Sequence, residues 1–351
     1  MPAVSGGMGY HLPITDAIAQ KGFRVSLIVP DKKIAELKFT HVVRYPMPSN
    51  WSAKLVTYLN SVWARQRFLT IKQLRPDIVH MMNSEGNPSA VLWARWIRRE
   101  LKCPLVVSVH DPEPHPGTWI GWVNYKLGSA TLRSATCVHI FSDYFVPFLV
   151  KDGIPLSKIV VIPLASDITP FTLHKRTGIA REKMVLFFGR LEAYKGLNIL
   201  VESAYQLRGQ YRFVIAGPGN LPPALKNQIL SAPDLFELRN YRLDEKEVAE
   251  LFLRASVCVM PYIQSTQSAI PWISAAFGVP VVATDSGGIA SQVRQMDGIV
   301  VPPRNAQALA DGIRKAVGRP VQWPPEWDID LIAGQYAVMY ETILSENYTK
   351  W

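Results

Sequence analysis

Residues 185–196 decide the fold, and they read Val185, Leu186, Phe187, Phe188, Gly189, Arg190, Leu191, Glu192, Ala193, Tyr194, Lys195 and Gly196. An apolar run typical of a buried strand ends at Gly189. Residues 197–201 then continue with the apolar spacing of a helix. Two cations, Arg190 and Lys195, therefore lie in a strand-to-helix turn.

A turn of this kind suits an anion. The first backbone N–H groups of a helix are unpaired and lie at the positive end of the helix dipole. Arg190 and Lys195 would add formal charge to that site. A Gly-Arg turn with a solvated lysine is also common on α/β surfaces, so this stretch alone leaves both interpretations open.

Strands and helices alternate on both sides of the turn. Apolar runs typical of strands lie at 24–30, 77–81, 104–109, 135–140, 159–163, 184–188, 211–216, 257–260 and 279–283. Helical spacing lies at 11–21, 88–102, 196–208, 244–255, 271–277 and 305–317. Near-continuous apolar strands that alternate with helices predict an α/β fold with parallel sheets. A chain of 351 residues suits two such domains.

The domain boundary is predicted in an aperiodic stretch. We expect a first Rossmann-like domain at 1–166, whose first strand is reduced to residues 2–4 or lies upstream, and a linker at 167–183. A second domain is expected at 184–326, and a closing helix at 327–351, with packing against the first domain as one option. Ligands of such sheets bind at the carboxyl ends of the strands, so a cleft between the domains is the expected site.

The net charge of +10 is unevenly distributed. Residues 1–175 carry 20 Lys and Arg against 11 Asp and Glu, a balance of +9, whereas residues 176–351 carry 18 against 17, a balance of +1. A basic first half suggests anionic lipid, a phosphorylated acceptor or nucleic acid. Nucleic acid is not expected as a partner, because no signature of a nucleic-acid-binding fold is present.

Two aromatic stretches in the basic half, 93–99 and 119–126, bear on the same question. Trp and Arg side chains suit a lipid interface. Alternatively, the tryptophans are core residues of helices that cover a sheet. Both interpretations stay open.

Composition excludes several classes of protein. No apolar run reaches the ~18 residues of a membrane-spanning helix, and the N-terminus lacks a signal-peptide pattern. We expect a cytoplasmic protein, with peripheral binding at the inner face of the membrane left open. Cys103, Cys137 and Cys258 are odd in number and lack metal-ligand spacing, so neither a disulfide framework nor a zinc site is expected.

Four ordered motifs carry a family resemblance: residues 189–191 with 195–196, residues 214–219, residues 255–261 and residues 276–288. Together they resemble a retaining glycosyltransferase of the GT-B fold, family 4 (glycosyl transferases group 1) type, over nearly the whole chain. The resemblance implies two Rossmann-like domains that face each other across a cleft. It also implies transfer of a hexose-like unit from a nucleotide diphosphate sugar to a hydroxyl of a lipid-linked or polysaccharide acceptor.

Two other functions remain as alternatives. The first is a catalytically impaired relative that binds a nucleotide or glycan, or supports a partner enzyme. The second is a dinucleotide oxidoreductase, which ranks last because no Gly-x-Gly-x-x-Gly fingerprint is present.

The resemblance also implies roles for single residues. Positions that match Arg190 and Lys195 hold the donor diphosphate, where charge builds as the glycosidic bond breaks, so fixed cations favour the transition state. No cofactor and no divalent metal are then expected; the Asp-x-Asp spacing of Asp328 and Asp330 lies in the C-terminal tail and is interpreted as solvated surface. A glycine loop follows the N-terminus, and Gly6 and Gly7 match the family's donor-approach loop, with a plain turn as the alternative.

His110 matches a family position that reaches the donor sugar near the reacting centre. His110 and Asp111 are the catalytic candidates, and Asp111 or His115 could orient the acceptor. A structural loop is the alternative. A metal held by His110, Glu113 and His115 is not expected in so short and proline-rich a stretch.

One departure from the family pattern affects the donor site. The family commonly carries two glutamates eight positions apart, which address the sugar and the ribose hydroxyls, and Ser265 and Ile273 occupy the matching positions. The loop before the next helix still offers Ser265, Gln267, Ser268 and Ala269, whose amides and side chains are candidate donor contacts.

Overall fold

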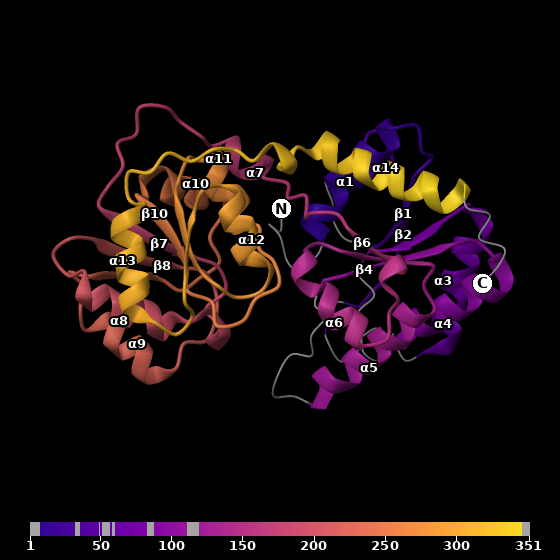
Figure 1. Ribbon diagram of the computed structural model, residues 1–351, viewed down its shortest axis with the longest axis horizontal. Coiled ribbons are helices and arrows are strands. Elements are labelled where there is room, and N and C mark those ends of the chain that lie inside the picture. The colour runs from indigo at the N-terminus through magenta and orange to yellow at the C-terminus, as the bar shows by residue number, and fades with distance from the viewer. Residues whose placement is uncertain are drawn as a thin grey trace. The chain divides into compact units, whose positions relative to one another are not determined.

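The computed structural model describes residues 8–31, 36–48, 50, 57, 60–82, 88–110 and 119–345, with the backbone alone at 8–11, 88 and 119–125 (Figure 1). The chain forms two compact units. The first combines Met1–Ala165 with Glu326–Trp351, and the second is Ser166–Pro325. The α/β fold with parallel sheets is confirmed.

The second unit is built on one six-stranded parallel sheet. Its order is β12, β11, β10, β7, β8, β9. The strands are β7 (Met184–Phe188), β8 (Arg212–Ala216), β9 (Phe236–Arg239), β10 (Val257–Met260), β11 (Val281–Thr284) and β12 (Ile299–Val301). The strands β10 and β11 are wholly buried, which explains their unbroken apolar sequences.

Helices connect these strands. They are α7 (Thr169–Thr172), the short 3₁₀ turn η4 (Ala193–Lys195), α8 (Leu197–Gln206), α9 (Pro223–Leu230), α10 (Glu245–Arg254), α11 (Ile270–Ala276), α12 (Gly288–Gln295) and α13 (Ala306–Ala316). The start of α10 is fixed by a capping box, in which Asp244 accepts from the Glu247 N–H and the Glu247 side chain accepts from the Asp244 N–H.

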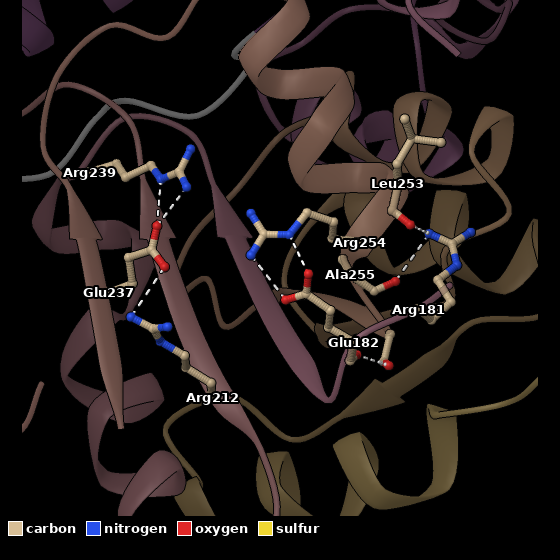
Figure 2. A network of polar contacts seen from close by, with 9 residues as sticks. Arg181, Glu182, Arg212, Glu237, Arg239, Leu253, Arg254 and Ala255 are labelled. Carbon is tan, nitrogen blue, oxygen red and sulfur yellow. Dashed lines mark hydrogen bonds and ion pairs between the residues drawn. The ribbon is translucent and has the colours of Figure 1, made fainter. Parts of the chain in front are cut away.

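Residues 167–183 belong to the second unit, although the sequence predicted a linker there. Phe171 in α7 is 5% exposed. Arg181 donates to backbone carbonyls at the end of α10 and at Phe277, and its contacts with Leu253 and Ala255 are drawn in Figure 2. A buried aromatic ring and a clamped guanidinium fix this segment without helical periodicity, so the sequence pattern could not show it.

An edge strand carries another group of contacts in Figure 2. Glu237 on β9 lies 2.6 Å from Arg239 and 3.3 Å from Arg212 of β8. Charged residues alternate with apolar residues along β9, so the sequence pattern did not predict this strand. Charged side chains on an edge also discourage pairing with another sheet.

In the part of the first unit that the structure describes, the strands form two parallel sheets. One pairs β1 (Ser26–Pro30) with β2 (His41–Tyr45), and the other has the order β3 (Val79–Met81), β4 (Leu105–Val109), β5 (Cys137–Ile140), β6 (Ile159–Val161). The helices are α1 (Met8–Gln20), α3 (Ser61–Gln73), α4 (Pro88–Trp96), the π-helical turn η1 (Ile97–Leu101), α5 (Trp119–Arg133), α6 (Val146–Lys151) and α14 (Ile329–Ser345).

The C-terminal helix α14 packs on the first unit beside α1 (Figure 1). Asp328 accepts from the N–H groups of Asp330 and Leu331 at 2.8 and 3.1 Å and so begins the helix. Asp330 lies 3.5 Å from Lys21 of the segment after α1. The Asp-x-Asp pair therefore has a structural role at a helix start.

Candidate functional site

The strand order of the second unit reverses between β7 and β10. The chain adds β8 and β9 on one side of β7 and then places β10, β11 and β12 on the other. In open parallel sheets, ligands bind at the carboxyl ends of the strands where this reversal occurs. The residues to consider therefore lie in the loop after β7, residues 189–196, and the loop after β10, residues 261–269.

Backbone contacts hold these two loops together. The carbonyl of Tyr194 accepts from the N–H of Ile263 at 2.8 Å. Gly196, with φ of +66°, begins α8, and a Cβ atom there would lie 1.9 Å from the carbonyl oxygen of Pro261. Only glycine permits this close approach, so the Lys195-Gly196 pair of the sequence is a packing requirement as well as a turn.

Arg190 follows β7 and is the solvated member of the cation pair. Its side chain is 66% exposed. The guanidinium donates to Glu192 at 2.6 Å and to the hydroxyl of Tyr194 at 3.1 Å. Part of its charge is therefore already compensated by a carboxylate of the same loop.

Lys195 is the half-buried member. Its Nζ lies 3.6 Å from the ring centroid of Tyr262 and 5.1 Å from that of Tyr194. Burial and the neighbouring Arg190 charge lower the pKa of Lys195 to about 7, against a smaller opposing effect of Glu192. The prediction of two cations in one turn holds for their positions, but their surroundings differ.

The loop after β10 is anchored to α12. The Ser268 N–H donates to the side-chain oxygen of Gln292 at 3.2 Å, and the Gln292 amide returns a bond to the Ser268 carbonyl at 3.3 Å. At the start of α12, a Cβ on Gly287 (φ +59°) would lie 1.6 Å from the carbonyl oxygen of Ser265. Gln292 is a residue that the sequence analysis missed, because α12 was not predicted.

The remaining donor candidates lie in the same loop. Ser265, Gln267 and Ala269 are partly exposed, and the side-chain oxygen of Gln267 is buried without a hydrogen-bond partner among the described residues. Ile273, by contrast, is 3% exposed within α11. The position where the family commonly has a second glutamate is thus filled by a buried aliphatic side chain.

His110 lies at the end of β4 in the first unit. Its Nε2–H donates to the carbonyl of Met82 at 3.0 Å. The ring stacks on Phe141, with centroids 4.5 Å apart. Gly6, Gly7, Asp111, Glu113 and His115 lie outside the described residues, so their predicted roles stay predictions.

A buried polar network lies next to His110. It joins three strands to the C-terminal helix: His80 of β3 lies 2.6 Å from the Tyr340 hydroxyl and 2.7 Å from Ser108 of β4. Ser108 lies 2.7 Å from Nδ1 of His139 on β5, and Tyr336 lies 3.4 Å from Nε2 of the same ring. His139 and Ser108 are 0% exposed.

The proton positions in this network follow from the carbonyl of Ile162, the acceptor at its end. Nε2 of His139 lies 3.0 Å from the carbonyl of Ile162, which can only accept, so Nε2 carries the proton. Nδ1 of His139 then accepts from Ser108, Ser108 accepts from Nε2–H of His80, and Nδ1 of His80 accepts from Tyr340. Burial lowers the pKa of His139 to about 3, in keeping with a neutral ring.

The tryptophans of 93–99 are partly buried against the core. Trp93 and Trp96 pack against the buried cluster around β4 and β5, and the Trp93 indole N–H donates to the carbonyl of Ala64 at 2.8 Å. Arg95, Arg98 and Arg99 are exposed. The sheet-covering interpretation therefore holds for these two tryptophans, whereas the side chains of Trp119 and Trp122 lie outside the described residues.

Two features are absent from the part of the chain that the structure describes. Within it, His, Cys, Asp and Glu side chains nowhere gather in a group of three that could hold a metal ion. Within the same residues, each helix is too short or too polar to cross a membrane.

Comparisons with known proteins agree with the fold and the motifs. Residues 182–318 match the family described as "Glycosyl transferases group 1", and residues 6–165 match the family described as "Glycosyl transferase 4-like domain". A glycogen synthase of Mycobacterium tuberculosis is 27% identical over 274 residues, which cover 72% of this chain and 62% of that protein. The alpha-D-kanosaminyltransferase of Streptomyces kanamyceticus is 25% identical over 307 residues, which cover 78% of each chain.

Solved structures share the architecture. HepE of Anabaena in complex with UDP has a TM-score of 0.64 at 18% identity, with 97% of this chain and 94% of that chain covered. Sucrose-phosphate synthase of Thermosynechococcus elongatus has a TM-score of 0.65 at 17% identity, with 95% and 89% covered. At these identities the likeness establishes the fold.

Proposed function

Because the chain belongs to the group 1 glycosyl transferases and has the GT-B fold, we propose that it moves a sugar from a nucleotide diphosphate sugar to a hydroxyl, with retention of anomeric configuration. We further propose that the acceptor is a lipid-linked or polysaccharide glycan. The observation that carries the proposal is the pair Arg190 and Lys195 beside the strand reversal between β7 and β10.

The two cations supply what the leaving group requires. When the glycosidic bond breaks, negative charge grows on the diphosphate oxygen. Arg190 and Lys195 would stabilise that charge more in the transition state than in the ground state, which accelerates the step. Two fixed cations can do this without a divalent metal, so we expect transfer to persist in the presence of a chelator.

The first unit contributes hydrogen bonding in this proposal. The bond between Nε2–H of His110 and the Met82 carbonyl fixes the ring at the end of β4, where we propose that it hydrogen-bonds the donor sugar. Such a contact would orient the sugar ring near the reacting carbon. Asp111, Gly6 and Gly7 stay candidate contacts of the donor or acceptor, as the family resemblance implies.

The donor base and sugar are open to direct test. The Anabaena protein HepE is described in complex with UDP and with UDP-glucose, so uridine donors are the first probes. In this chain Ser265 and Ile273 replace the usual glutamates, and Ile273 is buried. We propose that Ser265, Gln267, Ser268 and Ala269 take over part of the donor contacts through their amides and side chains.

A cytoplasmic location at the inner membrane face is part of the proposal. Arg95, Arg98 and Arg99 are exposed on α4 and η1, and the first half of the chain holds the +9 balance. Cationic side chains of this kind attract anionic headgroups. Sedimentation with vesicles that contain anionic lipid, at low and high salt, tests it; failure to sediment at low salt would contradict it.

The second candidate is a non-catalytic relative that binds a nucleotide or supports a partner. The absence of acidic side chains at Ser265 and Ile273 favours it. The paired cations Arg190 and Lys195 do not discriminate, since they would bind a diphosphate in either case. Only turnover separates the two candidates.

The proposal is tested by a thermal-shift panel followed by a turnover assay. The panel contains UDP, GDP, ADP and dTDP sugars, with the free nucleotides as controls. We expect one nucleotide class to raise the Tm, because a ligand that binds only the folded state stabilises it. Release of that nucleotide on incubation with its sugar donor would then favour an enzyme, and saturable binding with no release would favour the second candidate.

A further inference from the structure

Lys195 is held by aromatic rings, whereas two other described lysines are held by carboxylates. Lys21 pairs with Asp330 at 3.5 Å and Lys72 with Glu100 at 3.2 Å. Among the residues that the structure describes, no ion pair joins Lys195 to a carboxylate, because the nearby Glu192 pairs with Arg190. The ammonium of Lys195 instead lies 3.6 Å from the centroid of the Tyr262 ring.

The Tyr262 ring is itself fixed in place. It is 1% exposed and follows β10 directly. The hydroxyl of Thr284 on β11 donates to the Tyr262 carbonyl, and the next residue, Ile263, donates to Tyr194. Because the Tyr262 ring is fixed beneath the Lys195 side chain, it restricts where the Lys195 ammonium can lie.

We propose that Tyr262 is a positioning residue for the donor diphosphate: its ring face holds the Lys195 ammonium in place and leaves that charge uncompensated for an incoming diphosphate. This inference rests on the proposed function. A ring attracts a cation through its quadrupole and offers no negative charge that a diphosphate would have to displace. A carboxylate at the same place would hold Lys195 equally well but would oppose anion binding.

The different surroundings of Arg190 and Lys195 suggest that the two cations have different roles. The bond between Glu192 and Arg190 must break before the guanidinium can turn to a ligand. Lys195 lies over the Tyr262 ring and, within the described part of the chain, has no such bond to break. The groups that face Lys195 are Arg190 and Glu192 from the loop after β7, Tyr194 from η4 and Tyr262 from the loop after β10. Tyr262 thus acts through Lys195 and is not itself expected to touch the diphosphate.

The test is a double-mutant cycle on UDP binding by calorimetry. Tyr262→Leu should weaken UDP binding roughly 3- to 30-fold, the range expected for a desolvated cation–ring contact. In a Lys195→Ala background the same substitution should change the affinity by less than about twofold. Tyr262→Phe removes only the hydroxyl and should bind UDP within about threefold of the natural chain.

Because Tyr262 is a core residue, a second series of variants separates an effect on binding from an effect on folding. Phenylalanine analogues with increasing numbers of fluorine atoms at position 262 keep the shape of the ring and weaken its quadrupole. Affinity for UDP should fall stepwise with fluorination while the Tm stays constant. Unchanged affinity across the fluorinated series, or an equal effect of Tyr262→Leu with and without Lys195, would overturn this inference alone. Failure of the natural chain to bind any nucleotide diphosphate would instead overturn the proposed function.

Discussion

The strand ends of the two units differ in the state of their ionisable groups. In the second unit, the loop after β7 carries two cations, one of which lies beside the Tyr262 ring of the loop after β10 and, among the described residues, has no ion pair with a carboxylate. In the first unit, His80 lies in β3, His139 in β5 and His110 just after β4, and His80 and His139 are tied into a network whose geometry fits neutral rings. The same parallel-sheet architecture thus offers charge in one unit and uncharged hydrogen bonding in the other.

This contrast assigns separate chemical tasks. A diphosphate requires fixed positive charge, which the second unit supplies. A sugar is uncharged and requires oriented donors and acceptors, which a neutral histidine supplies. Substitutions in the two units should therefore affect different kinetic constants.

His110→Ala should have the largest effect on turnover. Removal of a group that orients the reacting sugar is expected to lower kcat about 100-fold or more while the Kd for UDP changes less than about twofold. His41→Ala is the matched control, because His41 is an exposed histidine on the edge of the other sheet of the same unit. Near-normal turnover of His110→Ala with a competent donor and acceptor would remove His110 from the site.

The two cations should be unequal. Lys195→Ala is expected to weaken UDP binding roughly 10- to 100-fold, as loss of a charged hydrogen bond costs about 1.5–3 kcal/mol. Arg190→Ala should cost less, about 3- to 10-fold, because Arg190 is exposed and already paired with Glu192. Arg208→Ala is the control, since Arg208 pairs with Asp234 on the surface of the same unit. Equal losses for both cations would contradict the contrast between them.

The first unit should be sensitive to acid. The pKa of His139 is about 3 in the folded protein and ordinarily 6.5, so between these values the unfolded chain binds more protons. The free energy of unfolding should therefore fall as the pH falls from 6.5 towards 3, by at most about 1.4 kcal/mol per pH unit. Urea denaturation at pH 7 and pH 5 measures this slope, and His139→Asn should reduce it; an unchanged slope would show that His139 is not the group responsible.

Donor affinity should decrease in mild alkali. Lys195 loses its charge as the pH rises through about 7, whereas the diphosphate of a sugar nucleotide stays ionised, so affinity should fall from pH 6 to pH 9 by less than tenfold per unit. Lys195→Arg keeps its charge throughout this range and should give a flat profile. A steep profile in Lys195→Arg would assign the titration to another group.

The second unit was predicted in part from the sequence. Its strands β7, β8, β10 and β11 are continuous apolar runs, and the predicted ranges overlap all of them. The strand β9 was missed because Glu237 and Arg239 interrupt its apolar pattern, and β12 was also missed, although β3 and β6 are equally short and were predicted. Continuous burial leaves a clear signal in the sequence, whereas a charged edge does not.

The candidate site was predicted only in part. Arg190 and Lys195 lie in a turn that sequence spacing reveals, and the family motifs surround them. Tyr262 could not be found in this way, because its contact with Lys195 depends on β10 lying beside β7, two strands that are far apart in the chain. Gln292 was missed because it lies on α12, a helix that the sequence analysis did not predict, and its bond to Ser268 joins that helix to the loop after β10.

The central claim is that the turn after β7 binds the donor diphosphate, and calorimetric titration with UDP of the natural chain and of the double variant Arg190→Ala, Lys195→Ala tests it most directly. We predict measurable affinity for the natural chain and loss of at least about 30-fold in the double variant, with an unchanged Tm in the absence of ligand. Equal affinity of the two proteins for UDP would contradict the account.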